Sequence, residues 1–199
     1  MQARLLPAES FRRMRWLNGA GWTREIHRQP AQSEAFHWRA SIAEIDADGP
    51  FSPFPGCQRQ QALLRGNGLR LRFDSGEVVL EPPHGQHAYP GDVAVNATLI
   101  DGPVHAFNLI WRPRAVDVRV LHRPLVGATL FFPEPGVRWL VYLIQGQARL
   151  RQSDDQLVLA AGDALLLEPH DGAGIASHSG RRLLDGGGEA LVCRIASIE

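Results

Sequence analysis

The chain has 199 residues, 44% of them hydrophobic and 21% charged, which suits a soluble globular protein with a sizeable core. Its formal net charge is zero and all 21 basic residues are Arg, which argues against nucleic acid as a partner and excludes a catalytic Lys. Two Cys without a CxxC spacing argue against a disulfide framework or a zinc site. The N-terminus carries no apolar leader, and no stretch approaches about 18 apolar residues, so we expect a cytoplasmic protein without a membrane span.

The predicted elements are almost all strands. Residues 7–14 are the one helix candidate, with Pro7 in the first turn. Alternation then predicts half-buried strands over 66–73 and 146–153, because apolar and Arg side chains take turns. Further strand candidates are 36–45, 104–111, 138–144, 157–169 and 189–198. Many short strands separated by Gly and Pro predict an all-β sandwich or barrel with very little helix.

The two halves of the chain repeat one order of features, which suggests an internal duplication. Each half has a strand, a Gly turn, an alternating strand, a second turn, another strand, and then Gly-Asp before a last strand. Gly91-Asp92 and Gly162-Asp163 occupy this same place. The stretch YLIQG followed by AGDALLLEP resembles the cupin pattern, a small jelly-roll β-barrel. The resemblance implies a tandem cupin, or bicupin, with modules at 1–115 and 116–199 packed as one compact unit.

Metal-binding cupins resemble one another in an HxH pair, whose two imidazoles point the same way from a strand. This chain has no HxH. His84 and His87 are three residues apart in a Pro- and Gly-rich loop, and His170 and His178 stand alone. We therefore expect no bound metal and no cofactor.

Four stretches carry a second resemblance. They are WLNGAGWTREI (16–26), FHWRASIAEI (36–45), DGPFSPFPGCQRQQALLRGNG (48–68) and LIDGPVHAFNL (99–109). In this order they resemble the HutD/Ves family, which implies a bicupin without the usual metal ligands that modulates histidine utilisation and has no established reaction. Leu17, Ala20 and Ala106 depart from that family's common pattern, which has Lys, Gly and Asp at these places.

One strand face carries a candidate anion site. Alternation in WRASIAEI places Arg39, Ser41 and Ala43 on one face, which suits a cavity wall with an anchoring cation. The alternative is an Arg that faces solvent or pairs with an acid, and Glu25 is the candidate partner. Arg59 follows the stiff loop, and a second Arg at the mouth of a barrel forms a fork for a carboxylate.

Other residues complete the candidate ligand site. Phe51 and Phe54 in DGPFSPFPG form either a plug on the core or the preorganised wall of a pocket. Asn18 has turn chemistry as its alternative role, and Asn108 in HAFNLI needs polar partners if it is buried. The candidate ligand-binding residues are Asn18, Thr23, Arg39, Ser41, Phe51, Phe54, Arg59 and Asn108. No nucleophile constellation emerges, so no catalytic residue is assigned.

The residues favour a metal-independent bicupin that binds a small carboxylate, and the HutD/Ves resemblance implies that this is an acidic intermediate of histidine breakdown of the urocanate or formylglutamate type. One alternative is a metal-independent isomerase or hydrolase acting on the same acids. Another is a protein-interaction module, which needs Phe51 and Phe54 exposed as a patch. We also expect a homodimer, because edge strands of such sheets are templates for pairing.

Overall fold

The computed structural model describes residues 1–31, 33, 35–151, 156–169 and 180–198. They form two compact units: a first unit, Phe11–Val116, and a second unit, Met1–Ser10 with Asp117–Glu199. His170 and His178 lie outside the described residues. Strands make up nearly all the regular structure, as the sequence predicts, and no helix in the described part is long and apolar enough to cross a membrane.

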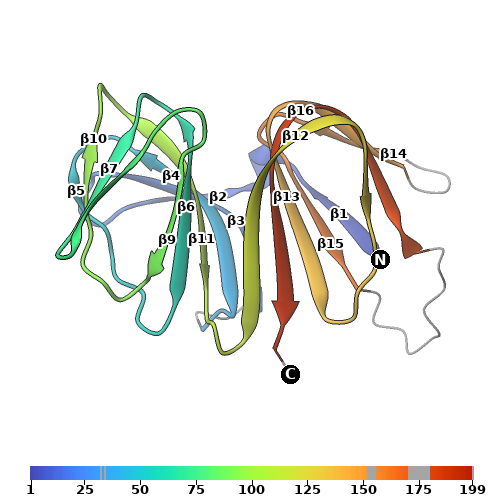
Figure 1. Ribbon diagram of the computed structural model, residues 1–199, viewed down its shortest axis with the longest axis horizontal. Helices are drawn as coiled ribbons and strands as arrows, with labels where there is room; N and C mark the ends of the chain where they lie inside the picture. Colours follow the sequence, from blue (N-terminus) through green and yellow to red (C-terminus); the bar gives the residue numbers. More distant parts are fainter. Residues whose placement is uncertain (32, 34, 152–155, 170–179, 199) are drawn as a thin grey trace. The chain divides into compact units, whose positions relative to one another are not determined.

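Two antiparallel sheets build the first unit (Figure 1). A six-stranded sheet has the order β2-β3-β4-β11-β6-β9, and a four-stranded sheet has the order β5-β10-β7-β8. The strands are β2 (Arg12–Arg15), β3 (Gly21–Gln29), β4 (Trp38–Ile45), β5 (Gly49–Pro50), β6 (Gln58–Arg65), β7 (Leu69–Phe73), β8 (Gly76–Leu80), β9 (Gln86–Pro90), β10 (Asn96–Leu99) and β11 (Val104–Trp111).

The core of the first unit joins the two sheets. Leu69 and Leu71 are fully buried on β7, while Arg72 is exposed, so the alternation read from the sequence is confirmed there. These leucines pack with Leu63, Val104 and other apolar residues of the larger sheet. Burial of such side chains contributes about 1.5–3 kcal/mol each. The core therefore fixes the inner face of the larger sheet, on which the candidate site lies.

The second unit has one sheet, in the order β1-β15-β13-β16-β12, with β14 paired to β13. Its elements are β1 (Gln2–Leu6), the 3-10 turn η1 (Ala8–Ser10), β12 (Val116–Phe131), β13 (Val137–Arg151), β14 (Gln156–Ala160), β15 (Ala164–Glu168) and β16 (Arg182–Ser197). Ala148 and Leu150 are buried between exposed Arg149 and Arg151, which confirms the second predicted alternation. The core is almost entirely aliphatic, and Asp163 caps the turn before β15 by accepting from the Ala160 N–H at 2.9 Å.

The structure corrects the predicted helix. Residues 7–14 form the short turn Ala8–Ser10 and then strand β2 rather than one helix. The N-terminal segment Met1–Ser10 also belongs to a different unit than the sequence predicts. β1 pairs antiparallel with β15, from Gln2 opposite Glu168 to Leu6 opposite Ala164, so Met1–Ser10 join the second unit rather than the module at 1–115 (Figure 1). Nothing local in the sequence specifies such a long-range pairing.

The predicted Gly turn of the second half is also wrong. β13 runs through Gly146, whereas the corresponding Gly66 does separate β6 from β7. Gly146 has φ +91°, and a Cβ there would lie 2.0 Å from the Gly187 carbonyl oxygen of β16. Glycine is needed at this position because two strand backbones approach closely, not because the chain turns.

Candidate functional site

A cavity of about 580 Å³ lies in the first unit, beside the inner face of the larger sheet and the loop after β5. We call it the acid pocket. Its lining residues are Met14, Arg15, Trp16, Leu17, Asn18, Thr23, Arg39, Ala43, Pro50, Phe51, Ser52, Pro53, Phe54, Arg59 and Asn108. The structure thus brings together seven of the eight candidate ligand residues, all but Ser41.

The loop DGPFSPFPG forms one wall of the acid pocket, and backbone hydrogen bonds hold it in place. The Phe51 N–H donates to the Val95 carbonyl at 2.9 Å, and the Phe54 N–H donates to the Gly91 carbonyl at 2.6 Å. A Cβ on Gly91 would lie 2.8 Å from the Phe54 carbonyl oxygen, so this close approach requires glycine. The stiffness of the loop comes from its prolines together with this anchorage.

The two phenylalanines of this loop have different surroundings. Phe51 is 8% exposed, packs in the core cluster, and meets the Trp16 ring edge-to-face at 5.9 Å. Phe54 is half-buried and lies 6.5 Å from the Phe36 ring. Phe51 is therefore both the core plug and the pocket wall that the sequence left as alternatives.

Arg59 is the most deeply buried cation of the acid pocket, with 5% of the residue exposed. Its Nε donates to Oδ1 of Asn108 at 2.8 Å. The guanidinium carbon lies 4.7 Å from the centre of the Phe51 ring and 5.7 Å from that of Tyr89. Burial lowers the pKa of Arg59, Tyr89 opposes that effect, and Arg39 adds to it, yet a guanidinium stays protonated in proteins.

No carboxylate within the described residues forms an ion pair with Arg59. A buried charge without a counter-charge is costly, because the protein interior solvates it far less well than water. The ring faces of Phe51 and Tyr89 compensate for part of that cost. The remaining guanidinium N–H groups are donors that an anion can accept from.

Arg39 already has an internal partner. Its Nε lies 2.9 Å from Oε2 of Glu25, which confirms Glu25 as the acid that the sequence offered as a partner. Glu25 also accepts from Arg28 Nε at 2.8 Å and makes a second contact with that guanidinium. Burial lowers the pKa of Arg39, Glu25 raises it, and Arg28 lowers it. Because one carboxylate serves two guanidinium groups, this trio keeps a net positive charge beside the pocket.

The neutral polar side chains of the acid pocket accept hydrogen bonds from the protein, which leaves their donor groups available. Trp16 Nε1 donates to Oγ1 of Thr23 at 2.8 Å, so the hydroxyl hydrogen of Thr23 is left to donate elsewhere. The Oδ1 of Asn108 is occupied by Arg59, which leaves the amide NH₂ as its second polar group. Asn18 accepts from the Ala20 N–H at 3.1 Å, which confirms its turn role at the pocket's edge.

Ser41 belongs to a buried polar row rather than to the lining of the pocket. It is 1% exposed, and its Oγ has no hydrogen-bond partner among the described residues. In the sheet, Asn108 of β11 lies opposite both Ser41 of β4 and Gln61 of β6. Gln61 is fully buried, accepts from the Tyr89 hydroxyl at 2.7 Å, and has an unpartnered Nε2. Facing residues of antiparallel strands share one side of the sheet, so Ser41, Asn108 and Gln61 lie on the same face of the sheet as Arg59.

Sequence analysis missed Arg15, Gln61 and Tyr89. Arg15 lines the acid pocket, while Tyr89 stacks on Arg59. The sequence could have identified Gln61, because it stands two residues after Arg59 on β6 and alternation places both side chains on one face. Tyr89 comes from β9, whose register with β6 has no local signature.

His84, His87 and the two cysteines do not line the acid pocket. His84 Nδ1 lies 2.9 Å from the Leu63 carbonyl oxygen, and the His87 ring stacks on Tyr89 with centroids 5.9 Å apart. Burial raises the pKa of the Cys57 thiol and, more strongly, that of the fully buried Cys193. Neither thiol has the lowered pKa of a reactive nucleophile.

The acid pocket therefore offers a defined chemistry. Of the residues that the structure describes, three Arg line it and no Asp or Glu does. Thr23 and Asn108 each accept a hydrogen bond from the protein and keep a donor for a ligand, and much of the remaining wall is aromatic or aliphatic. Such a site fits a small molecule that has a carboxylate, further hydrogen-bond acceptors and an apolar body.

Comparison with known families agrees with the motifs. A family model described as HutD matches residues 8–184. The chain belongs to the HutD family. A 21.2 kDa protein of Pseudomonas putida, described as lying in the hutC 3′ region, is 38% identical over 120 residues, which is 60% of this chain and 63% of that protein. The protein Ves of Citrobacter koseri is 37% identical over 160 residues, 79% of this chain and 78% of Ves.

Solved structures of the HutD family share the whole fold. HutD from Pseudomonas fluorescens SBW25, determined in a formate condition, is 28% identical, has a TM-score of 0.80, and matches over 100% of both chains. A conserved protein of unknown function from Pseudomonas aeruginosa PAO1 is 32% identical, with a TM-score of 0.82 and 100% coverage of both chains. A bacterial pirin from Escherichia coli is only 9% identical but has a TM-score of 0.65 over 98% of each chain, which supports a cupin fold.

Proposed function

We propose that this HutD-family protein is a metal-independent binding protein for a small organic acid, and that the acid pocket of the first unit is its binding site. The observation that carries the proposal is Arg59, a buried guanidinium that lines a cavity and has no carboxylate partner among the described residues. A ligand carboxylate would supply the missing charge. A charge-assisted hydrogen bond of this kind contributes about 1.5–3 kcal/mol.

The names of the family and of its relatives suggest a link with histidine utilisation. We propose that the ligand is an acidic intermediate of that breakdown, of the urocanate or formylglutamate type, and that binding lets the protein modulate the pathway. We further propose that the two units are tandem cupin modules, of which the first carries the ligand. All residues that line the acid pocket belong to the first unit, which is why we assign the ligand to that unit.

A thermal-shift screen tests the proposal. Urocanate and formylglutamate should each be compared with the corresponding neutral amide, on the full chain and on Arg59→Met. A ligand at about 100 times its Kd stabilises the native state by about 2.7 kcal/mol, which gives a measurable rise in Tm. The proposal predicts a rise with at least one acid, a smaller rise with its amide, and a smaller rise with the same acid on Arg59→Met. Equal shifts with an acid and its amide would contradict it.

A further inference from the structure

The first unit has a second cavity, of about 690 Å³, that shares no lining residue with the acid pocket. It lies between the hairpin of β7 and β8 and the strand β9, which are at the edges of the two sheets. Its lining residues come from three segments, 73–78, 87–90 and 92–94. The volume is within the range of about 300–1,000 Å³ that is usual for small-molecule sites.

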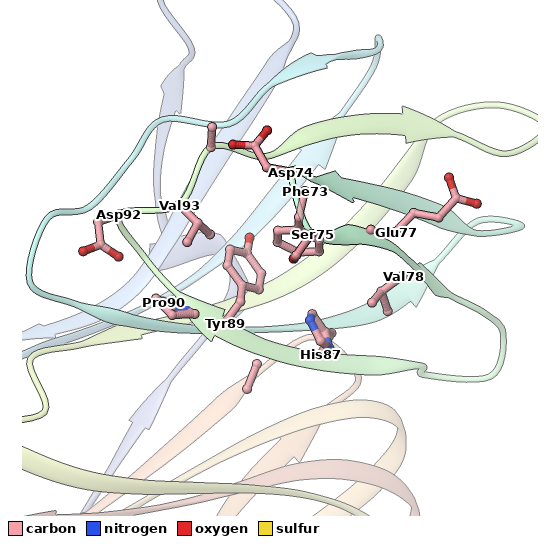
Figure 2. A pocket seen from close by; sticks show the side chains of 13 residues that line it. Phe73, Asp74, Ser75, Glu77, Val78, His87, Tyr89, Pro90, Asp92 and Val93 are labelled. Carbon is pink, nitrogen blue, oxygen red and sulfur yellow. The ribbon is translucent and has the colours of Figure 1, made fainter.

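Aromatic rings form the inner wall of this cavity. Figure 2 shows Phe73, His87 and Tyr89 along it, with Val78 and Val93 nearby. The Phe73 ring is edge-on to Tyr89 at 5.2 Å, and the Phe73 and His87 centroids are 5.6 Å apart. The Tyr89 hydroxyl donates to Gln61 and the Arg59 guanidinium lies over its ring, so the half-buried Phe73 and His87 supply the rings that a ligand can reach. Aromatic ring faces attract cations.

The charge of this second cavity is opposite to that of the acid pocket. Among the described residues, Asp74, Glu77 and Asp92 line it and no Arg does, whereas three Arg and no acid line the acid pocket. Figure 2 places the three carboxylates around the rings. Within the described part of the chain, Asp74 and Asp92 form no ion pair, while Glu77 lies 3.8 Å from Arg70 and 4.0 Å from Arg72.

The arrangement suits a bulky cation better than a metal ion. The carboxylate oxygens of Asp74, Glu77 and Asp92 do not gather within 4.8 Å of one another, so they do not form a coordination shell. We propose that this cavity, the cation pocket, is a second binding site that takes a small organic cation with an apolar body, such as an aryl-alkylammonium. The rings contact the body and the charge, and the carboxylates select its sign.

Three isosteric probes test the sign selection on the full chain: benzylammonium, benzyl alcohol and benzoate. Binding is followed by NMR through the ring signals of Phe73, His87 and Tyr89. We expect benzylammonium to shift these signals and to bind at least fivefold more tightly than benzyl alcohol. Benzoate should leave them unchanged, apart from changes that disappear in Arg59→Met and so report on the acid pocket.

Matched variants separate the effect of carboxylates in the cavity from the electrostatic attraction of the whole protein for a cation. An exposed carboxylate contributes up to about fivefold to such a contact, so Asp74→Asn with Asp92→Asn should weaken benzylammonium binding by about tenfold. Glu81→Gln removes an exposed acid outside the cavity and should change binding by less than about twofold.

Several results would overturn the cation pocket. They are equal binding of benzylammonium and benzyl alcohol, an effect of Glu81→Gln as large as that of the double variant, and ring signals that stay unchanged with benzylammonium. A failure of the acid pocket has a different signature, which is acid binding that persists in Arg59→Met.

Discussion

The Nε of Arg59 donates a 2.8 Å hydrogen bond to Oδ1 of Asn108, across the neighbouring strands β6 and β11. This bond fixes the plane of the guanidinium and uses one of its five N–H groups. It also uses the acceptor end of the Asn108 amide, so the remaining groups of the pair are donors. Arg59 and Asn108 together make a preorganised receptor for an anion, and the predictions below depend on that relationship.

Arg59→Met should separate stability from binding. Removing a buried charge that lacks a carboxylate partner should leave the free energy of unfolding unchanged or raise it, because an apolar side chain of similar length avoids desolvation. Acid binding should fall by at least about tenfold. Thermal unfolding with and without acid measures both, and Arg72→Met on the exposed face of β7 is the control. A large loss of stability would mean that the ring and amide contacts already satisfy Arg59.

Arg39→Ala should weaken binding of a small dicarboxylate by about ten- to a hundredfold, because one charge-assisted contact is lost. Glu25 keeps Arg28 as a partner, so the fold should survive with a loss of about 1–3 kcal/mol. Arg39→Lys should also weaken binding, since a point charge cannot form the bidentate fork. Calorimetric titration measures all three proteins. Unfolding of Arg39→Ala would make this residue a structural ion-pair member, and unchanged affinity would place the anchor elsewhere.

Phe51 and Phe54 should respond differently to truncation. Phe51→Ala removes a ring that is 8% exposed and packed against Trp16, and should cost about 3–5 kcal/mol of stability. Phe54→Ala removes a half-buried ring and should cost less than half as much, while still weakening ligand binding. Chemical denaturation and ligand titration of both variants test this contrast. Equal stability losses would contradict the assignment of Phe51 to the core and of Phe54 mainly to the wall.

Tyr89 should lose its phenolic proton at a higher pH than an ordinary tyrosine. Burial raises the pKa of Tyr89 to about 12, although Arg59 lowers it. Between the ordinary pKa near 10 and this higher value, the unfolded chain loses the phenolic proton and the folded chain keeps it, so stability falls as pH rises through that window. The chain has two tyrosines, so ultraviolet absorbance of Tyr142→Phe isolates Tyr89. Adding Arg59→Met should raise the pKa further; a fall would contradict this account of their contact.

The sequence predicted most of the acid pocket because its signals are local. Alternation placed Arg39 on the inner face of β4, and the proline-rich loop identified Phe51 and Phe54 as a stiff wall. Arg59 was predictable as a pocket residue because it follows this loop directly, at the start of β6. Ser41 follows the same alternation but is buried and does not line the pocket, because period alone does not give depth.

The rest depends on contacts between distant segments. Tyr89 reaches Arg59 only through the register of β9 with β6, and β1 joins the second unit only through β15. Residues 12–14 fall in the predicted helix because Pro7 suits a first helical turn, whereas pairing of β2 with β3 makes them part of a strand. The cation pocket combines residues 73–78 with 87–94, and no local motif connects these two segments.

Metal removal gives a further test of the proposed function. We expect untagged purified protein to carry no stoichiometric transition metal, and a chelator to leave both Tm and acid binding unchanged. Elemental analysis and thermal unfolding with and without chelator measure this. Near-equimolar zinc, iron or nickel, or a Tm lowered by the chelator, would contradict metal-independent binding.

Calorimetric titration of urocanate and formylglutamate into the wild-type chain and into Arg59→Met, each beside its neutral amide, tests the central claim most directly. The account predicts that at least one acid binds the wild-type chain, that its amide binds at least about tenfold more weakly, and that Arg59→Met removes the difference. An acid that binds Arg59→Met as tightly as the wild-type chain, or no binding of either acid, would contradict it.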